Sequence, residues 1–348
     1  MKATILHAPR DIRVEEVDDP AIQRPTDALV RVTAACVCGS DLWPYRGINE
    51  VARPRRIGHE FVGIVEEVGA DVRSLRPGDF VIAPFLYSDN TCPHCQVGMQ
   101  SACSNGGGWG GRDSEGLMVD GGQGEYVRVP LADGTLVSTR EVPDEKQVPS
   151  LLALSDVMGT GWHAAVAAGV REGDTVAVVG DGAVGLCGVL AAAQMGAERV
   201  VVMSRHESRQ RLATSFGATD VVAERGEAGE AAVRDLTDGV GVDAVLECVG
   251  TGEAMQTAIA IARPGATVGY VGVPHGVELP VRDMFARNVG VAGGVAPVRA
   301  YLPRLRDDVL NGVISPGAVF DLELPLAEAA EAYAAMDERR AIKSLIRP

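Results

Sequence analysis

The segment from residue 175 to residue 273 alternates short β-branched runs with stretches of helical character. The expected strands are Thr175–Gly180, Arg199–Ser204, Val221-Val222, Val242–Val249 and Ala266–Val273. The expected helices between them are Ala183–Met195, Glu207–Phe216, Ala231–Leu236 and Glu253–Ala262, and another is expected before them over residues 155–170. Such alternation predicts βαβ units and a doubly wound parallel sheet. The strands are continuously apolar, as is typical of a sheet covered on both faces.

A glycine-rich turn follows the first of these strands. The run Gly180-Asp181-Gly182-Ala183-Val184-Gly185 has the G-x-G-x-x-G pattern and opens a helix. The first glycine would make the turn, the second would admit the pyrophosphate, and the third would pack helix on strand. Phosphates then bind at the helix N-terminus. This context favours a dinucleotide site over a plain glycine-rich turn, with Val249, Gly272 and Val273 at later strand ends expected to line it.

The end of the second strand bears on which dinucleotide binds. NAD sites usually carry an acidic residue there, whereas this chain has Ser204 and Arg205, with Arg209 one helical turn beyond Arg205. A hydroxyl and a guanidinium can hold a 2′-phosphate. The alternative is that the arginines only solvate a helix start, where cations are disfavoured by the helix dipole. The pattern favours NADP(H) over NAD(H).

The first 150 residues have a different pattern. Short apolar runs, Ala28–Val32, Phe61–Val68 and Phe80–Ala83, are separated by turn residues such as Pro77-Gly78-Asp79. This predicts a β-rich barrel or sandwich with long loops. A helix near Val298–Asn311 and a terminal strand near Lys343–Arg347 follow the parallel sheet.

Composition limits the class of protein. A chain of 348 residues suits two domains. Its net charge of −15 argues against nucleic-acid or anionic membrane partners. No apolar stretch of membrane-spanning length and no secretory signal is evident. Seven cysteines suit free thiols or metal ligands better than a disulfide framework, so we expect a cytoplasmic protein.

Cys38 and His59 each lie in a short motif that suits a zinc ligand. The motifs are Cys38-Gly39-Ser40-Asp41 and Gly58-His59-Glu60. Thiolate and imidazole are ligands that Zn²⁺ favours. A third ligand is needed, and spacing alone does not choose among the candidates: Cys36, Glu60, Asp156 and His163.

A second group of candidate ligands lies in the loop 88–105. It reads Asp89-x2-Cys92-x2-Cys95-x7-Cys103, and closely spaced cysteines in a loop suit a closed structural zinc site. Asp89 stands where a fourth cysteine would complete the set. The alternatives are a redox pair or disulfide of Cys92 and Cys95, a partly filled site, or His94 as the fourth ligand.

Together these motifs resemble the zinc-dependent alcohol dehydrogenases of the medium-chain dehydrogenase/reductase superfamily. The resemblance spans nearly the whole chain, and Gly58–Gly63, Val68-Gly69 and Pro77–Val81 carry it as well. It implies a GroES-like catalytic domain, 1–154 with 294–348, and a Rossmann domain, 155–293. It also implies hydride transfer between a nicotinamide and an alcohol, aldehyde or ketone polarised by zinc.

The resemblance also implies roles for single residues. Cys38, His59 and Asp156 would bind the catalytic zinc, in the aspartate version seen in bacterial NADP-dependent secondary alcohol dehydrogenases. Glu60 would be an alternating fourth ligand or a group just outside the ligand set. Ser40 would carry the substrate proton outward, with Glu60 and Asp156 also counted as catalytic residues.

One position departs from the family pattern. Many members carry a proton-shuttling histidine where this chain has Trp43, whose indole cannot shuttle a proton. We expect the proton to leave through water or another group near Ser40. Trp43, Tyr45 and Trp109 either wall an apolar substrate pocket or pack in the core.

Two other functions are compatible with this fold. One is a zinc-independent quinone or enone reductase, and the other is a non-catalytic NADPH-binding protein. The Cys38, His59 and Asp156 set disfavours both. The resemblance further implies a homodimer or homotetramer, with Val289–Gly293 as a pairing edge strand.

Overall fold

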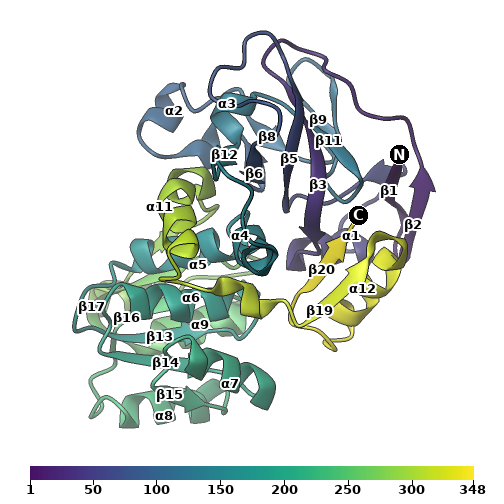
Figure 1. The fold of residues 1–348 in the computed structure, drawn as a ribbon. Coiled ribbons are helices and arrows are strands. Elements are labelled where there is room, and N and C mark those ends of the chain that lie inside the picture. Colours follow the sequence, from purple (N-terminus) through teal and green to yellow (C-terminus); the bar gives the residue numbers. More distant parts are fainter. The chain divides into compact units, whose positions relative to one another are not determined.

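The computed structural model describes residues 1–348. The chain forms two compact units (Figure 1): residues 1–156 with 297–348, and residues 157–296. None of the helices is both long and apolar enough to cross a membrane.

The second unit is built on a six-stranded parallel sheet with the order β15-β14-β13-β16-β17-β18. The strands are β13 (Thr175–Val179), β14 (Arg199–Met203), β15 (Asp220–Val222), β16 (Val242–Glu247), β17 (Ala262–Tyr270) and β18 (Gly290–Gly293). The strand order reverses between β13 and β16, and such a switch point is where doubly wound sheets bind ligands.

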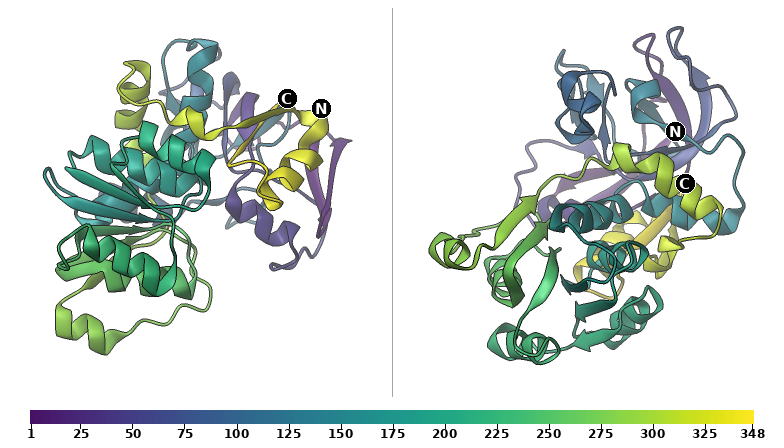
Figure 2. Two further views of the ribbon diagram at one scale, coloured as in Figure 1. Left: turned by 90° about the horizontal axis from the view of Figure 1, so that it is seen from below. Right: turned by 90° about the vertical axis from the view of Figure 1, so that its left-hand side faces the viewer.

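Helices lie on both sides of this sheet in the left view of Figure 2. They are α5 (Val157–Ala168), α6 (Ala183–Gln194), α7 (Glu207–Ser215), α8 (Gly226–Asp235), α9 (Gly252–Ile261) and α10 (Val281–Arg287). Central strand residues such as Ala177, Val201 and Val245 are fully buried, as predicted for a sheet covered on both faces. The expected doubly wound fold is therefore confirmed.

Some element boundaries were wrong. α8 begins five residues before the expected Ala231, and α10 was not expected. β17 covers Ala262–Tyr270 instead of Ala266–Val273. Its first residue pairs with Val242 ahead of a register shift, so the turn residues Pro264 and Gly265 lie within the strand.

The first unit is organised around a seven-stranded sheet. Its main path has the order β12-β6-β5-β3-β20-β19, and β11 also pairs with β3. The strands are β3 (Ala28–Cys36), β5 (Phe61–Val68), β6 (Phe80–Ala83), β11 (Tyr126–Val129), β12 (Val137–Ser138), β19 (Leu322–Pro325) and β20 (Ser344–Arg347). Leu345 of β20 lies opposite Cys36 of β3, so the last strand is paired directly to the strand before Cys38.

Shorter strands complete the first unit. One small sheet joins β1 (Lys2–Ala8), β2 (Asp11–Glu16) and β4 (Arg55–Arg56). Two antiparallel pairs join β7 (Leu86–Tyr87) to β8 (Gly107–Gly108), and β9 (Gly111–Arg112) to β10 (Met118–Val119). This organisation confirms the β-rich fold expected for the first 150 residues.

The helices of the first unit are mostly short. They are α1 (Leu42–Tyr45), α2 (Pro93–Gln96), α3 (Ala132–Thr135), α4 (Val148–Ala153), α11 (Val298–Leu310) and α12 (Ala329–Asp337). Single 3₁₀ turns are η1 (Gly39–Asp41), η2 (Gln100–Ala102), η3 (Glu145–Gln147), η4 (Pro316–Val319) and η5 (Leu326–Glu328). The unexpected α12 buries Tyr333 against Leu6 and Val37, and so joins the two ends of the chain in one core.

Candidate functional site

Sheet pairing brings Cys38 and His59 to one edge of the first unit. Cys38 follows the end of β3, and His59 precedes the start of β5. The two strands are antiparallel neighbours with Ala35 opposite Phe61, so the residues just beyond these positions meet. Gly58 has a φ of +99°, and a β-carbon there would lie 2.4 Å from Gln123 Cγ. A glycine is therefore required immediately before His59.

Four candidate ligands converge at this edge. The ligand atoms of Cys38, His59, Glu60 and Asp156 all lie within 4.8 Å of one another. Cys38 Sγ is 3.4 Å and His59 Nε2 is 3.5 Å from the same oxygen, Asp156 Oδ2. Tetrahedral zinc with bonds of roughly 2.0–2.3 Å places its ligands at similar separations. The donor set and its spacing fit a zinc ion, and Cys36 is not part of the set.

Asp41 fixes the orientation of the His59 ring. Its Oδ1 lies 3.3 Å from His59 Nδ1, while its Oδ2 accepts a hydrogen bond from the backbone N–H of Cys38. His59 Nε2 is thereby left facing Asp156. A carboxylate behind a metal-binding histidine is a common arrangement that sets the ring tautomer. The sequence motif contained Asp41, but our sequence analysis gave it no role.

A buried ion pair lies directly behind the ligands. Lys343 Nζ lies 2.7 Å from Glu60 Oε1, and the two side chains are 1% and 0% exposed. Lys343 also donates to the carbonyl of Val37, and the Cys36 thiol donates to Glu60 Oε2 at 3.2 Å. Both oxygens of Glu60 therefore have partners. Sequence reasoning missed Lys343 because it lies 283 residues from Glu60.

Burial and neighbouring charges together raise the pKa values of two candidate ligands, Cys38 and His59. Burial, followed by the charges of Asp156 and Glu60, raises the pKa of Cys38 to about 11. Burial alone would lower the pKa of His59, but Asp41 and Cys38 outweigh it and raise that pKa. Crowded anionic groups that hold protons are the expected state of a site built for a divalent cation.

Ser40 is an exposed polar residue beside the candidate ligands. Its Oγ lies 3.5 Å from His59 Nε2, and the residue is exposed. Phe85 packs edge-on to the His59 ring at 6.4 Å between centroids. A hydroxyl beside the ligands with access to solvent can pass a proton outward.

The three aromatic residues considered as walls of a substrate pocket have different surroundings in the structure. Tyr45 is buried beside Tyr333, with ring centroids 5.6 Å apart, and belongs to the core. Trp109 packs edge-on to Phe61 at 4.9 Å and donates from Nε1 to the carbonyl of Pro84. Core packing accounts for both, whereas Trp43 lies half-buried in α1.

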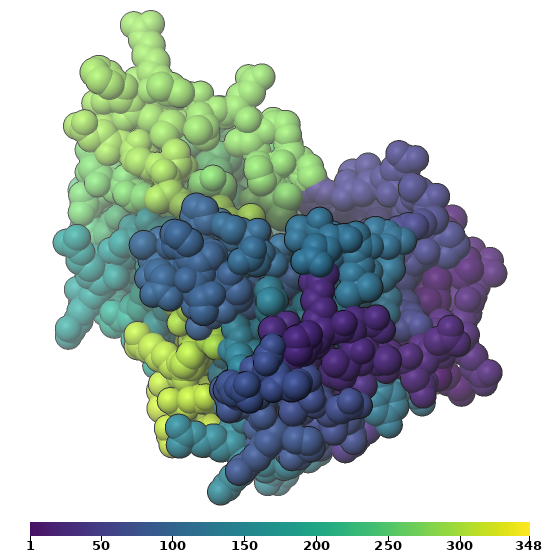
Figure 3. All heavy atoms as spheres, turned by 90° about the horizontal axis from the view of Figure 1, so that it is seen from above, coloured from purple at the N-terminus to yellow at the C-terminus, as the bar shows by residue number.

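The cysteine loop forms a second cluster, on the surface of the first unit. Cys92 Sγ lies 3.6 Å from Cys95 Sγ and 3.8 Å from Cys103 Sγ, and all three thiols are free. Sulfur atoms on a tetrahedral zinc lie roughly 3.8 Å apart. The spacing fits zinc and excludes a Cys92–Cys95 disulfide in this structure. Figure 3 shows the blue atoms of this loop on the outside of the molecule.

Asp89 completes this cluster of candidate ligands, which does not include His94. Burial alone would raise the pKa of Asp89, but the backbone N–H groups of Thr91 and Cys92 outweigh it and lower that pKa. Backbone donors hold the pKa of Cys92 at about 7. An ionised carboxylate and an acidic thiol are both suited to metal binding.

The glycine-rich turn of the second unit has room for a ligand. A β-carbon on Gly185 would lie 2.0 Å from the carbonyl oxygen of Gly180, so close helix–strand packing requires that glycine. At Gly182, the N-cap of α6, a β-carbon would meet no atom within 4 Å. Open space above a helix N-terminus suits an incoming pyrophosphate. Val249 and Val273 are exposed at the ends of neighbouring strands.

The Asp181 carboxylate lies among the candidate phosphate ligands Ser204 and Arg209, and it was not expected from the sequence. Ser204 Oγ donates to Asp181 Oδ2 at 2.8 Å, and Arg209 Nη1 lies 3.2 Å from Asp181 Oδ1. Arg205 is exposed and makes no ion pair. Sequence reasoning missed Asp181 because it occupies a variable position of the glycine motif. That position does not show which side chains the carboxylate contacts.

The chain matches two protein-family models. Residues 24–144 match the alcohol dehydrogenase GroES-like domain, and residues 183–307 match the zinc-binding dehydrogenase family. The zinc-type alcohol dehydrogenase B of Aspergillus flavus is 35% identical over 96% of this chain and 78% of its own length. The NADP-dependent isopropanol dehydrogenase of Thermoanaerobacter brockii is 35% identical over 84% of this chain and 83% of its own.

A solved structure agrees with these relatives. Alcohol dehydrogenase TADH from Thermus sp. ATN1 superposes with a TM-score of 0.91 and 33% identity, covering 100% of this chain and 99% of that one. The matches confirm the resemblance inferred from the motifs, and they establish an oxidoreductase that depends on zinc and a nicotinamide cofactor. The chain belongs to the zinc-dependent alcohol dehydrogenase family of the medium-chain dehydrogenase/reductase superfamily.

Proposed function

We propose that this oxidoreductase transfers a hydride between NADP(H) and an alcohol, aldehyde or ketone, as an alcohol dehydrogenase or carbonyl reductase. The convergence of Cys38, His59 and Asp156 on one point carries the proposal. One thiolate and one carboxylate balance the charge of Zn²⁺, and a third, neutral ligand leaves one tetrahedral position for the substrate oxygen.

Each residue near the site has a proposed task. Cys38, His59 and Asp156 hold the metal, which polarises the substrate oxygen when bound. Asp41 holds the His59 ring in place, and Lys343 holds Glu60 just outside or within the ligand set. Ser40 passes the substrate proton from the site towards solvent, because its exposed hydroxyl lies next to the ligands.

Three basic or polar side chains support NADP(H) as the cofactor. Ser204, Arg205 and Arg209 gather at the end of β14 and the start of α7, where the adenosine ribose of a dinucleotide lies in this fold. The isopropanol dehydrogenase relative is NADP-dependent by name. Asp181 counts against strict selectivity for NADP(H) over NAD(H). Its carboxylate contacts Ser204 and Arg209, and so competes with a bound phosphate for these side chains.

We further propose a second, structural zinc at Asp89, Cys92, Cys95 and Cys103. The four ligand atoms leave no position open, in contrast to the catalytic set. The two alternative functions, a zinc-independent reductase and a non-catalytic protein, are not favoured by the family matches.

The experiment combines metal analysis with a substrate panel. The purified enzyme should contain two zinc ions per chain and oxidise NADPH with aldehydes or ketones, faster than it oxidises NADH. Asp156→Asn should lose the catalytic zinc and at least a hundredfold in kcat/KM, while retaining the structural zinc. Full activity after loss of the catalytic zinc would contradict the mechanism, and a strong preference for NADH would contradict the cofactor assignment.

A further inference from the structure

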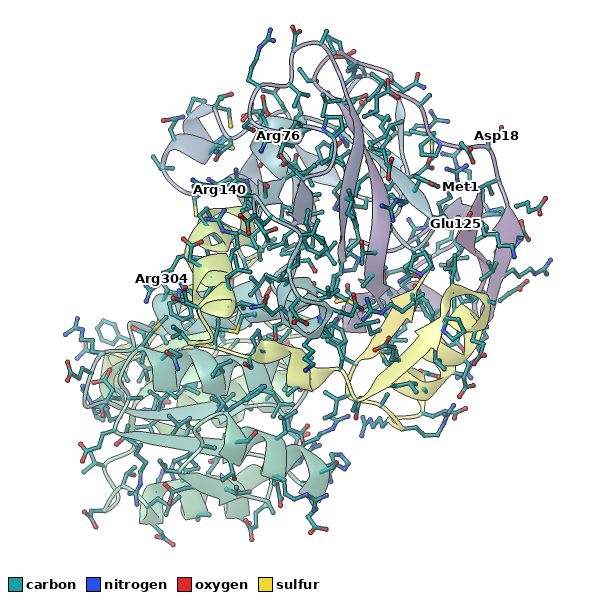
Figure 4. All side chains as sticks on the ribbon, viewed as in Figure 1. Met1, Asp18, Arg76, Glu125, Arg140 and Arg304 are labelled. Carbon is teal, nitrogen blue, oxygen red and sulfur yellow. The ribbon has the colours of Figure 1, made fainter.

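A basic pocket opens in the first unit, and its lining includes none of the candidate zinc ligands. The loop 71–79, the segment 133–140 and helix α11 surround it, and its volume is about 570 Å³. Five arginines line it: Arg73, Arg76, Arg140, Arg299 and Arg306. Figure 4 labels Arg76 and Arg140 above α11, and Arg304 on that helix.

The lining carries an excess of positive charge. The lining comprises five arginines and two carboxylates, Asp79 and Asp133, whereas the whole chain has a net charge of −15. Outside the lining, Asp307 pairs with Arg306 at 2.7 Å and Asp71 with Arg73 at 3.7 Å. Asp133 accepts hydrogen bonds from the backbone N–H groups of Arg73 and Ser74, so it braces a loop. Among the five arginines only Arg76 pairs with a lining carboxylate, at 3.5 Å.

Helix α11 contributes two half-buried guanidinium groups. Arg299 and Arg306 are seven residues apart, which is about two helical turns, so they share one face. Arg299 Nε donates to the carbonyl of Gly134, and Arg306 Nη1 donates to the carbonyl of Ser138, both at 2.7 Å. These carbonyls fix both groups in place. Arg306 is also paired with Asp307 at 2.7 Å, whereas no ion pair neutralises Arg299.

The two groups repel each other. Burial, and then the charge of Arg306, lower the pKa of Arg299. Arg299 has no carboxylate partner, and its two terminal nitrogens make no hydrogen bond within the protein. Keeping the half-buried Arg299 charge without a counter-charge of its own is costly unless an anion compensates it.

Arg140, like Arg299, is a lining guanidinium without an ion-pair partner. Its backbone has a φ of +69°, a conformation that is uncommon for a residue with a side chain. Its backbone N–H donates to Ser138 Oγ, while its guanidinium makes no ion pair. Arg140 can therefore turn towards a ligand without breaking an existing contact.

We propose that this pocket binds a small, multiply charged anion that carries a phosphate group. Guanidinium forks match phosphate oxygens in geometry, which makes arginine the preferred side chain for such ligands. The volume is in the range of small-molecule sites and exceeds what a bare phosphate ion needs. None of the lining residues belongs to a zinc ligand set or to the dinucleotide turn, so the inference does not depend on the proposed function.

The test is a ³¹P NMR titration of inorganic phosphate with the zinc-loaded enzyme at constant ionic strength. The substituted pocket residues are not part of the dinucleotide turn, so the difference between the wild type and the variants reports on the pocket. We expect saturable broadening of the inorganic phosphate signal. The double variant Arg140→Gln/Arg299→Gln should weaken the apparent affinity at least tenfold. Arg304→Gln is the matched control, because Arg304 lies on the same helix outside the pocket, and it should stay within twofold.

A loss of folding is checked separately from a loss of binding. Zinc content and thermal unfolding of each variant show whether it is intact, and Arg140→Gln alone has no intramolecular ion pair to lose. It should weaken phosphate binding about threefold. Equal affinities of the wild type and the double variant, or no broadening with the wild type, would overturn the proposal. Tighter binding of malonate than of phosphate would overturn the assignment of the ligand class.

Discussion

Asp181 sets the charge of the proposed NADP(H) site at the scale of single residues. Its carboxylate contacts Ser204 and Arg209, the groups proposed to hold the 2′-phosphate. A phosphate entering this position would meet a like charge, which favours the unphosphorylated ribose of NAD(H). The balance between Asp181 and the exposed Arg205 therefore decides how strongly the enzyme distinguishes the two cofactors.

Asp181→Asn should raise the preference for NADP(H) over NAD(H), measured as the ratio of kcat/KM values, by about tenfold. This corresponds to about 1.4 kcal/mol, a modest part of the repulsion between charges at close range. Glu207→Gln is the control, because Glu207 is 85% exposed and pairs with Arg211. It should change the ratio less than twofold. An unchanged ratio in Asp181→Asn would show that the carboxylate lies away from the bound phosphate.

Lys343→Met should destabilise the enzyme by about 3–5 kcal/mol, because it leaves the Glu60 charge buried without its partner. The double variant Glu60→Gln/Lys343→Met should recover much of that loss, since no charge then remains unpaired. Urea unfolding of the zinc-loaded proteins measures both. A double variant no more stable than Lys343→Met would show that the two side chains act independently.

Zinc binding at Cys38 and His59 should release about two protons near pH 7, because both groups hold protons in the metal-free site. Their raised pKa values make zinc affinity increase with pH, and the Cys38 contribution persists up to about pH 11. Calorimetric titrations in buffers with different ionisation enthalpies count the released protons. A heat that is independent of the buffer would contradict the assignment.

At the scale of elements, the cysteine loop is a short structure that depends on its candidate ligands. Its helices α2 and η2 have four and three residues, too few to be stable alone. The exposed Val97 and Met99 show that little apolar burial compensates. The loop should therefore rely on bound metal for its order.

Asp89→Asn should release the proposed structural zinc at least tenfold faster to a chromogenic chelator, because it removes one of four anionic ligands. Asp89→Cys should retain the metal, since it restores the charge with a fourth thiolate. His94→Ala is the control and should behave as the wild type, because His94 lies outside the ligand cluster. Rapid release from His94→Ala, and not from Asp89→Asn, would reverse the choice of fourth ligand.

The parts predicted correctly from sequence depend on local patterns. The turn Gly180–Gly185 lies between a strand and a helix, and Cys92-x2-Cys95 lies in one loop, so neighbours in sequence suffice. Two contacts depend on which strands become neighbours: the Glu60–Lys343 ion pair and the hydrogen bond from Ser204 to Asp181. No local pattern encodes which strands are neighbours. Helix α12 was missed because alanines supply most of its buried face and give a weak apolar signal.

At the scale of the whole molecule, the edge of the parallel sheet is the proposed pairing surface. β18 pairs only with β17, and its outer edge carries unpaired backbone groups. The preceding helix α10 exposes Phe285 at 84% and Val281 at 67%. Apolar side chains beside an open strand edge suit association with a second copy.

Phe285→Glu should shift the enzyme towards monomer in sedimentation velocity experiments, because it places a charge in the proposed apolar contact. Val221→Glu, at an exposed apolar position on the opposite edge strand β15, is the control and should leave the oligomeric state unchanged. A Phe285→Glu protein that sediments as the wild type does would exclude α10 from the interface.

The pairing of β20 with β3 has a consequence for how the enzyme is made. A ribosome synthesises Cys38, His59 and Glu60 early, but the strand that flanks β3 and the ammonium that neutralises Glu60 come 283 residues after that carboxylate. A nascent chain released before Lys343 would carry the ligands without the charge and the strand that steady them. Secure capture of the metal is thus delayed until Lys343 and β20 have been synthesised, and chains terminated before them should be easily stripped of zinc and cleared by proteases.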